Sequence, residues 1–199
     1  MKKTGVLLVN LGTPTSFSPR DVKRYLNQFL TDPRVIDIPY LLRQFLVRLL
    51  IVPKRYKESA ALYRTIWDDK KGSPLFFHSQ EDADRLQHLL GDTFDVRLAM
   101  RYQNPSIESV ITHFQGVKKL VVLPLFPQYA SATTGSIHEK ILKIVASWTV
   151  IPEVQLISSY FNHPFMIEAF AQRGEEIDIH TFDHVVFSYH GLPQSQIIK

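Results

Sequence analysis

The sequence contains no cysteine. Disulfide bonds, thiol nucleophiles and cysteine-bound zinc or iron–sulfur sites are therefore excluded from it. It also lacks any stretch near the ~20 apolar residues of a membrane-spanning helix, a glycine-rich phosphate loop and a block of five or more basic residues. These absences argue against a membrane span, a nucleotide cofactor and a nucleic-acid partner.

The composition is that of an ordinary globular protein. Hydrophobic residues make up 45% of the chain, charged residues 21%, and the net charge is +4. A core of useful size is therefore available, and disorder is not expected. The slight excess of positive charge favours an acidic ligand or an anionic surface. The absence of cysteine also agrees with a cytoplasmic protein.

Short apolar runs alternate with amphipathic stretches along the whole chain. Helices are expected where apolar residues recur every three to four positions, over 18–30, 40–52, 73–90, 104–114, 137–148 and 164–173. Strands are expected at 6–9, 94–102, 120–125, 154–158 and 184–189. The alternation predicts an α/β fold, a flavodoxin-like parallel sheet with helices on both faces. Residues 1–160 would form this first domain, and 161–199 the start of a second, similar one.

The stretch 40–52 is apolar almost all round its expected helix, with basic residues at one edge and Pro53 beyond it. One interpretation is a helix buried against the rest of the protein. The other is an exposed lip that covers an apolar ligand or makes peripheral contact with a membrane.

The unusual residues follow the expected strands. They form the segments 10–14, 101–102, 124–136 and 190–193. Because ligands of parallel sheets bind beyond the carboxyl ends of the strands, these segments indicate a binding site. Their aromatic, apolar and hydroxyl groups, with one arginine, suit a flat hydrophobic ligand that carries carboxylates.

The eight histidines do not form a metal-binding motif in the sequence. His180 and His184 are spaced i, i+4 but precede an expected strand, where that spacing does not bring the rings together. An extended chain from His184 to His190 would span about 20 Å, so these two cannot share an ion. His190 stands out because it ends an expected strand and precedes a Gly-Leu-Pro turn.

Several motifs, in order from end to end, closely resemble those of bacterial ferrochelatases. They occupy residues 6–14, 25–36, 63–67, 72–75, 100–102, 123–136 and 187–193. The resemblance implies two flavodoxin-like halves with a porphyrin cleft between them, and Fe²⁺ insertion into a porphyrin as the activity. It also implies that His190 is the essential histidine, that 40–52 is the hydrophobic lip, and that the cleft is lined by Leu11, Ser73, Arg101, Tyr102, Tyr129 and Thr134.

The resemblance further implies that Fe²⁺ and protoporphyrin IX are substrates and that no cofactor is bound permanently. Protoporphyrin is expected because Leu11 stands where relatives that prefer coproporphyrin often carry tyrosine. His190 would accept pyrrole protons, bind the incoming iron, or do both. Arg101 would contact a propionate or orient the ring.

The family's partner glutamate is expected beyond Lys199, so the chain by itself would hold half of a cleft. The alternatives are a non-catalytic porphyrin-binding module and a related cobalt or nickel chelatase. The oligomeric state is left open.

Overall fold

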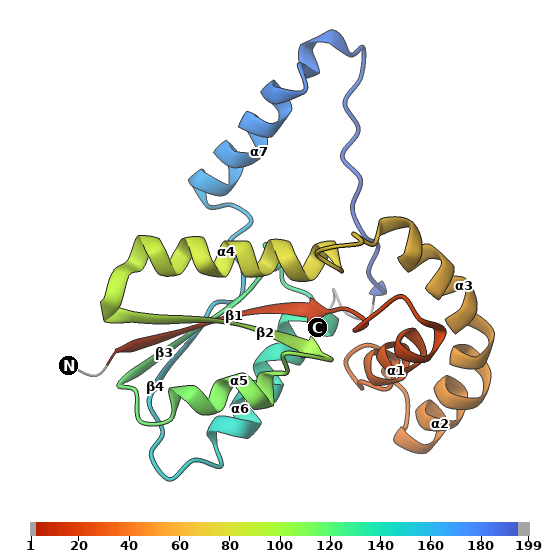
Figure 1. Ribbon diagram of the computed structural model, residues 1–199, viewed down its shortest axis with the longest axis horizontal. Helices are drawn as coiled ribbons and strands as arrows, with labels where there is room; N and C mark the ends of the chain where they lie inside the picture. Colours follow the sequence, from red (N-terminus) through yellow and green to blue (C-terminus); the bar gives the residue numbers. More distant parts are fainter. Residues whose placement is uncertain (1–2, 195–199) are drawn as a thin grey trace.

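Four parallel strands form the centre of the structure, a computed structural model that describes residues 3–194 (Figure 1). The strands are β1 (Thr4–Gly12), β2 (Phe94–Tyr102), β3 (Lys119–Pro124) and β4 (Glu153–Leu156), in the order β2-β1-β3-β4. The central β1 pairs Thr4 with Phe94 on one side and with Lys119 on the other. The parallel sheet is therefore confirmed, with the strand order of a flavodoxin-like unit.

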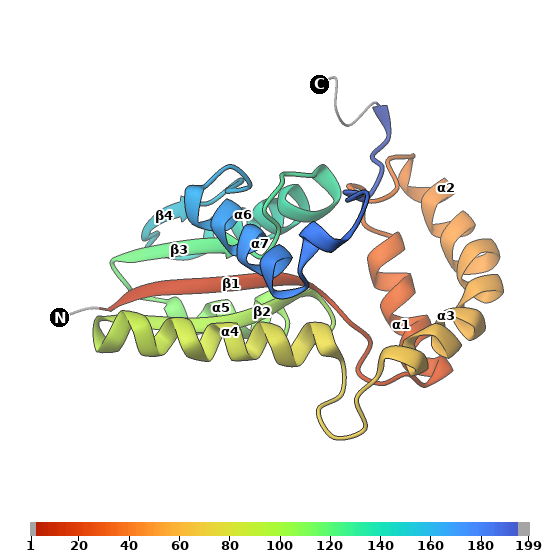
Figure 2. The same ribbon diagram turned by 90° about the horizontal axis from the view of Figure 1, so that it is seen from above.

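Helices cover both faces of the sheet, as predicted (Figures 1 and 2). On one face lies α4 (Pro74–Leu90), and on the other lie α5 (Ile107–Ile111) and α6 (Ser136–Val145). Each face of the sheet packs a hydrophobic core, and alternate residues of β1 contribute to one core or the other because successive strand side chains point to opposite faces. Leu7 and Val9 pack towards α5 and α6, whereas Val6 and Leu8 pack towards α4.

The helices that residues 19–66 form lie beyond the carboxyl ends of the strands (Figure 2). Helix α1 (Pro19–Leu30) begins as predicted, with the Ser18 hydroxyl accepting a hydrogen bond from the Asp21 N–H at 3.2 Å. The stretch predicted to be helical over 40–52 forms α2 (Tyr40–Phe45), then a π-helix (Leu46–Ile51), and continues as α3 (Val52–Ile66).

Helix α3 continues through Pro53, where the sequence analysis placed an end. Proline donates no N–H, and its ring crowds the preceding turn. The wider π turn before it relieves both problems, with the Val52 N–H bonded to the Val47 carbonyl. The helix expected over 104–114 also begins later than predicted, because α5 starts at Ile107, after its N-cap Ser106.

A π-helix (Ser131–Gly135) leads into α6, and short 3₁₀-helices occupy Gly91–Thr93, Thr112–Phe114 and Ile179–Thr181. None of the helices formed by residues 3–194 combines the length and apolar content needed to cross a bilayer.

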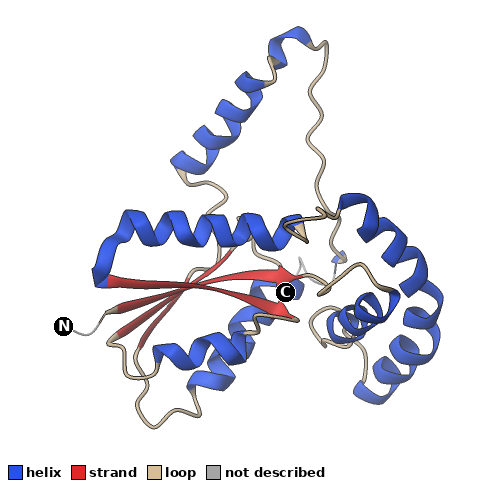
Figure 3. Cartoon of the chain, in the orientation of Figure 1, coloured by secondary structure: helices blue, strands red, loops and turns tan. Residues whose placement is uncertain are grey.

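Helix α7 (Pro164–Glu176) stands away from the sheet and its covering helices (Figure 1). From 161 to 194 no described residue is buried. The prediction of a strand at 184–189 is wrong, because this stretch is a loop with no strand pairing (Figure 3). A strand needs a hydrogen-bonded neighbour, and the four-stranded sheet ends at β4. The division into domains at 160 stays a prediction.

Candidate functional site

The carboxyl ends of β1 and β2 come very close together. Gly12 is the register partner of Tyr102 and has a φ of +108°. A Cβ atom at Gly12 would stand 1.9 Å from the Tyr102 carbonyl oxygen, so any larger residue would force the strands apart. The two strand ends thereby bring the predicted site residues Leu11, Arg101 and Tyr102 to one edge of the sheet.

A buried carboxylate organises the polar groups at this edge. Asp32, which follows α1, accepts three hydrogen bonds at Oδ2, from Arg101 Nη2 at 2.5 Å, the Tyr102 hydroxyl at 2.9 Å and the Ser136 hydroxyl at 2.6 Å. Its Oδ1 accepts a fourth from the Arg34 backbone N–H at 2.8 Å. Arg101 Nε also donates to the Ser136 hydroxyl at 2.6 Å. We call Asp32, Arg101, Tyr102 and Ser136 the Asp32 cluster.

The charges within the Asp32 cluster balance. Arg101 and Asp32 form an ion pair whose side chains are 16% and 4% exposed. Burial raises the pKa of the Tyr102 phenol well above its usual range, and the negative charge of Asp32 acts in the same direction. Tyr102 is therefore a neutral hydrogen-bond donor at physiological pH. Because Nε and Nη2 of Arg101 are engaged inside the cluster, Nη1 is the guanidinium nitrogen available to a ligand.

Aromatic side chains continue from the cluster onto α1 and α3. The Phe29 ring meets Tyr102 edge-on, with centroids 5.3 Å apart, and stacks on Tyr25 at 5.9 Å. Tyr63 of α3 meets Tyr25 edge-on at 6.2 Å. Burial raises the pKa of the Tyr25 phenol, and the neighbouring Tyr63 adds to the shift. Tyr25 and Tyr102 are buried, whereas Phe29 and Tyr63 are partly exposed and place aromatic surface beside the polar cluster.

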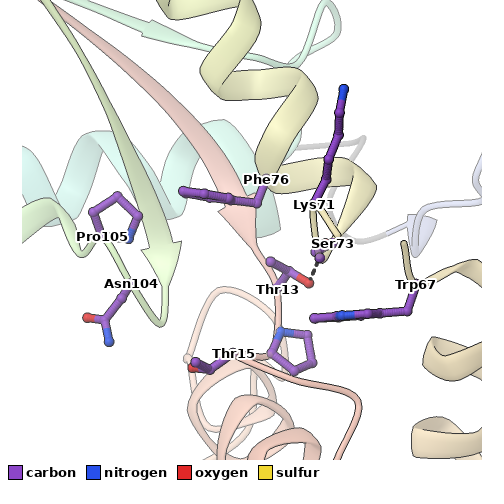
Figure 4. A pocket seen from close by; sticks show the side chains of 10 residues that line it. Thr13, Thr15, Trp67, Lys71, Ser73, Phe76, Asn104 and Pro105 are labelled. Carbon is purple, nitrogen blue, oxygen red and sulfur yellow. Dashed lines mark hydrogen bonds between the residues drawn. The ribbon is translucent and has the colours of Figure 1, made fainter. Parts of the chain in front are cut away.

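A pocket of about 490 Å³ opens where the turns after β1 and β2 face the start of α4 (Figure 4). The predicted residue Ser73 lies in it, buried, and its hydroxyl accepts a hydrogen bond from the Thr13 hydroxyl at 2.9 Å. Trp67, Phe76 and Pro105 supply apolar and aromatic surface. The pocket can therefore hold an apolar group next to two hydroxyls, of which Thr13 donates to Ser73.

The π-helix before α6 holds the predicted residue Thr134. Its side chain is fully buried, and its hydroxyl oxygen has no hydrogen-bond partner in the described structure. Beside it, a Cβ atom on Gly135 would stand 2.9 Å from the Tyr129 hydroxyl and 3.0 Å from Arg34 Nη1. Arg34 pairs with Glu139 and donates to the Ser131 hydroxyl at 3.2 Å. Tyr129, also predicted, is 51% exposed.

The helical stretch 40–52 exposes most of its apolar side chains, although Val47 and Val52 are buried. We call this surface the lip, and its exposed members are Tyr40, Leu41, Leu42, Phe45, Leu49 and Leu50. Beneath it lies a pocket of about 350 Å³, lined by Leu30, Ile36, Leu50, Ile51, Lys54 and Arg55. A patch of six exposed apolar side chains on a helix edged by Arg and Lys is typical of a surface that meets a ligand or a bilayer.

Arg43 belongs to the same stretch but is buried. It donates to the backbone carbonyls of Thr31 at 2.9 Å and Ile38 at 2.7 Å, and more weakly to that of Ile36 at 3.4 Å. The guanidinium therefore ties the start of the lip to the loop between α1 and α2, which carries Asp32.

His190 lies in the exposed loop after α7, and its side chain is not turned into the core. It does not line the pocket of Figure 4 or the pocket under the lip. No group of three His, Asp or Glu side chains suited to a metal ion occurs among residues 3–194. The structure thus brings Arg101 and Tyr102 together in the Asp32 cluster. Thr134 is close in sequence to Ser136 of that cluster. His190 is not brought into contact with Arg101 or Tyr102.

Sequence reasoning did not single out Asp32, Ser136 or Arg34 as site residues. In the sequence, Asp32 is visible only as a residue beyond the expected helix 18–30 and as a member of the motif 25–36, because the aspartate's partners are 69, 70 and 104 residues away along the chain. A buried aspartate is costly unless it is paired, but burial of this residue is not visible in a local pattern.

Comparisons with known proteins complete the description. A family model described as ferrochelatase matches residues 3–199. A ferrochelatase of Legionella pneumophila (strain Corby) is 45% identical over 197 residues, which cover 99% of this chain and 59% of that protein. A ferrochelatase of Coxiella burnetii is 44% identical over 201 residues, covering 99% of this chain and 55% of that protein. The chain thus spans little more than half the length of these relatives.

Proposed function

This chain belongs to the ferrochelatase family, and on that premise we propose that the protein carrying it inserts Fe²⁺ into protoporphyrin IX to form protohaem. The observation that carries the proposal is the family match over residues 3–199, the whole chain apart from its first two residues. Both iron and porphyrin are substrates in this reaction, so the protein's task is to bind, orient and deprotonate the porphyrin.

The chemistry of the described surface suits a porphyrin, which is flat, apolar and edged by two carboxylates. The partly exposed rings of Phe29 and Tyr63, backed by the buried Tyr25, and the exposed lip offer apolar contact. Lys54 and Arg55 adjoin apolar side chains in the pocket under the lip, a combination that fits a carboxylate on an apolar ring. Leu11 at the end of β1 is half-buried and adds no polar group, which favours protoporphyrin.

Metal insertion requires two pyrrole N–H protons to leave while the iron loses its water ligands. A flat porphyrin keeps its nitrogen lone pairs in the ring plane, so the cleft should bind a puckered ring that is nearer to the transition state. His190 accepts the pyrrole protons, since imidazole is the side chain best matched to proton transfer at neutral pH, and it meets the iron at the same face. The Asp32 cluster presents Arg101 Nη1 for orienting the ring.

The test compares His190→Ala with His184→Ala, a second exposed histidine on the same loop. Protoporphyrin binding is followed by the porphyrin absorbance, and insertion by the loss of porphyrin fluorescence when Fe²⁺ is added without oxygen. H190A should lower the insertion rate by about 10²–10⁴-fold, the usual contribution of a general base, with porphyrin binding retained. H184A should behave as the parent protein. Normal turnover by H190A would refute the assignment.

The same assay tests two alternatives. Porphyrin binding without insertion of any metal would indicate a non-catalytic porphyrin-binding protein. Faster insertion of Co²⁺ or Ni²⁺ than of Fe²⁺, in competition, would indicate a related chelatase.

The lip supports a peripheral contact with a membrane in addition to its contact with the porphyrin. Leu41 is 80% exposed and Leu49 61% exposed, next to Arg48 on the same turn. Apolar side chains flanked by cations bind the surface of an anionic bilayer.

A further inference from the structure

We propose that Asp32 is a positioning residue of this site, which fixes the Arg101 guanidinium and the Tyr102 hydroxyl against α6 and couples them to the loop that precedes the lip. The inference deepens the proposed function, and its consequence for porphyrin binding rests on that function. Asp32 itself does not touch the substrate in this proposal, because its side chain is 4% exposed.

The Asp32 carboxylate joins separate elements of the fold. Asp32 Oδ2 accepts from Arg101 and Tyr102 at the end of β2 and from Ser136 in the first turn of α6. The amino end of a helix carries partial positive charge, so a carboxylate there is further stabilised. Figure 2 shows that α1, β2 and α6 approach one another from different layers of the fold. Asp32 therefore accepts from all three groups at once, in addition to the hydrogen bond that Arg101 donates directly to Ser136.

The side chains of Arg34 and Arg43 hold the backbone around Asp32 in place. Arg34 pairs with Glu139 of α6 and donates to Ser131. Arg43 holds the carbonyls of Thr31 and Ile38, one on each side of Asp32 along the loop. Since the loop is held from α6 and from the lip helix, the carboxylate stays in one place. A displacement of the lip helix would consequently be transmitted to Arg101.

The role proposed for Asp32 depends on the negative charge of its carboxylate. All four groups that face the Asp32 carboxylate are donors, and one is cationic. An asparagine in the same position could turn its carbonyl towards Arg101, Tyr102 and Ser136. Its NH₂ group would then face the Arg34 N–H, and the Arg101 charge would lose its counter-charge. Asp32→Asn thus keeps the shape but removes the property that the proposal invokes.

The experiment measures protoporphyrin affinity for D32N, R101Q and the double variant, with Asp92→Asn as a matched control. Asp92 is exposed and lies before the amino end of β2, at the other end of the sheet. D32N should weaken binding about tenfold, which corresponds to the loss of ~1.4 kcal/mol. The double variant should bind as well as R101Q alone, because Asp32 acts through Arg101. An equal loss from D32N in both backgrounds would overturn the proposal.

A second measurement does not involve porphyrin. Burial is the main cause that raises the pKa of the Tyr102 phenol, and the negative charge of Asp32 and its hydrogen bond raise it further. In D32N the tyrosinate absorbance of one residue should therefore appear at lower pH than in the parent protein, and Tyr102→Phe should remove that change. An unchanged alkaline titration would overturn the positioning role. If the parent protein does not bind porphyrin, the proposed function fails, while this titration still decides the role of Asp32.

D32N leaves the partly buried Arg101 cation without its counter-charge and is the variant most prone to misfold. In that case thermal unfolding of the double variant decides. Removing both charges should raise the unfolding midpoint above that of D32N, and a double variant as unstable as D32N would contradict the coupling.

Discussion

Replacing Gly12 with alanine tests the close approach of β1 and β2 on which the whole site geometry depends. The change has two costs. The first is conformational, because a φ of +108° disfavours any residue with a Cβ atom, at about 1–2 kcal/mol. The second is steric, since the new Cβ would lie 1.9 Å from the Tyr102 carbonyl oxygen, whereas real Cβ contacts begin at 3.0 Å.

Gly116 separates these two costs. It also has a positive φ, +85°, but a Cβ atom there would meet nothing within 4 Å. Gly116→Ala should therefore destabilise the protein by about 1–2 kcal/mol, through backbone strain alone. Gly12→Ala should in addition part the strand ends and break hydrogen bonds of the β1–β2 ladder worth about 1 kcal/mol each, for a total of about 4 kcal/mol.

The measurement is urea unfolding of the parent and both variants, followed by far-ultraviolet circular dichroism. The free energy of unfolding should fall more for G12A than for G116A, and the thermal midpoint by about 2–4 °C for each kcal/mol. A similar m-value would show that the unfolded state has not changed. Equal destabilisation by the two substitutions would refute the reasoning, because it would mean that β1 and β2 do not approach closely at Gly12.

Two further predictions concern the lip and its attachment. Arg43→Met should lower the free energy of unfolding by about 2–3 kcal/mol in urea titration, since it leaves buried carbonyls without their charged donor. The control, Arg48→Met on the exposed side of the same helical stretch, should have little effect. Equal effects of the two substitutions would contradict the role of Arg43 as a buried donor. Replacing Phe45 and Leu49 together with serine should weaken sedimentation with anionic vesicles roughly tenfold or more, as expected when buried apolar area is lost. Leu89→Ser, at an exposed leucine of α4, is the control, and unchanged vesicle binding by the lip variant would exclude membrane contact there.

Much of the fold follows from local patterns. The strand predicted at 94–102, where apolar and polar residues alternate, has the observed bounds of β2, and the helix predicted over 18–30 begins at Pro19 after its N-cap Ser18. These signals are strong because they depend on the geometry of one element. The alternation of strands and helices then implied a parallel sheet, with a site at its carboxyl edge.

Local patterns failed where the outcome depended on a neighbour. Residues 184–189 carry strand-forming side chains, but they remain a loop because no strand lies beside them. Pro53 indicated a helix end, yet the preceding π turn carries the helix on to Ile66. In each case the deciding contact is made by another part of the chain, or by a backbone distortion that composition does not encode.

For the site, the sequence by itself determined which chemical groups are present: an arginine and a tyrosine at the end of β2, hydroxyls before α6, an apolar helix at the edge, and His190. Only the tertiary structure decided how they are used. It paired Arg101 with Asp32, buried Arg43 beneath an otherwise exposed lip, and left His190 on a loop away from that pairing. Hydrogen bonds and ion pairs between residues 69 to 104 positions apart depend on the packing of whole layers, whereas the pattern of a single helix or strand does not.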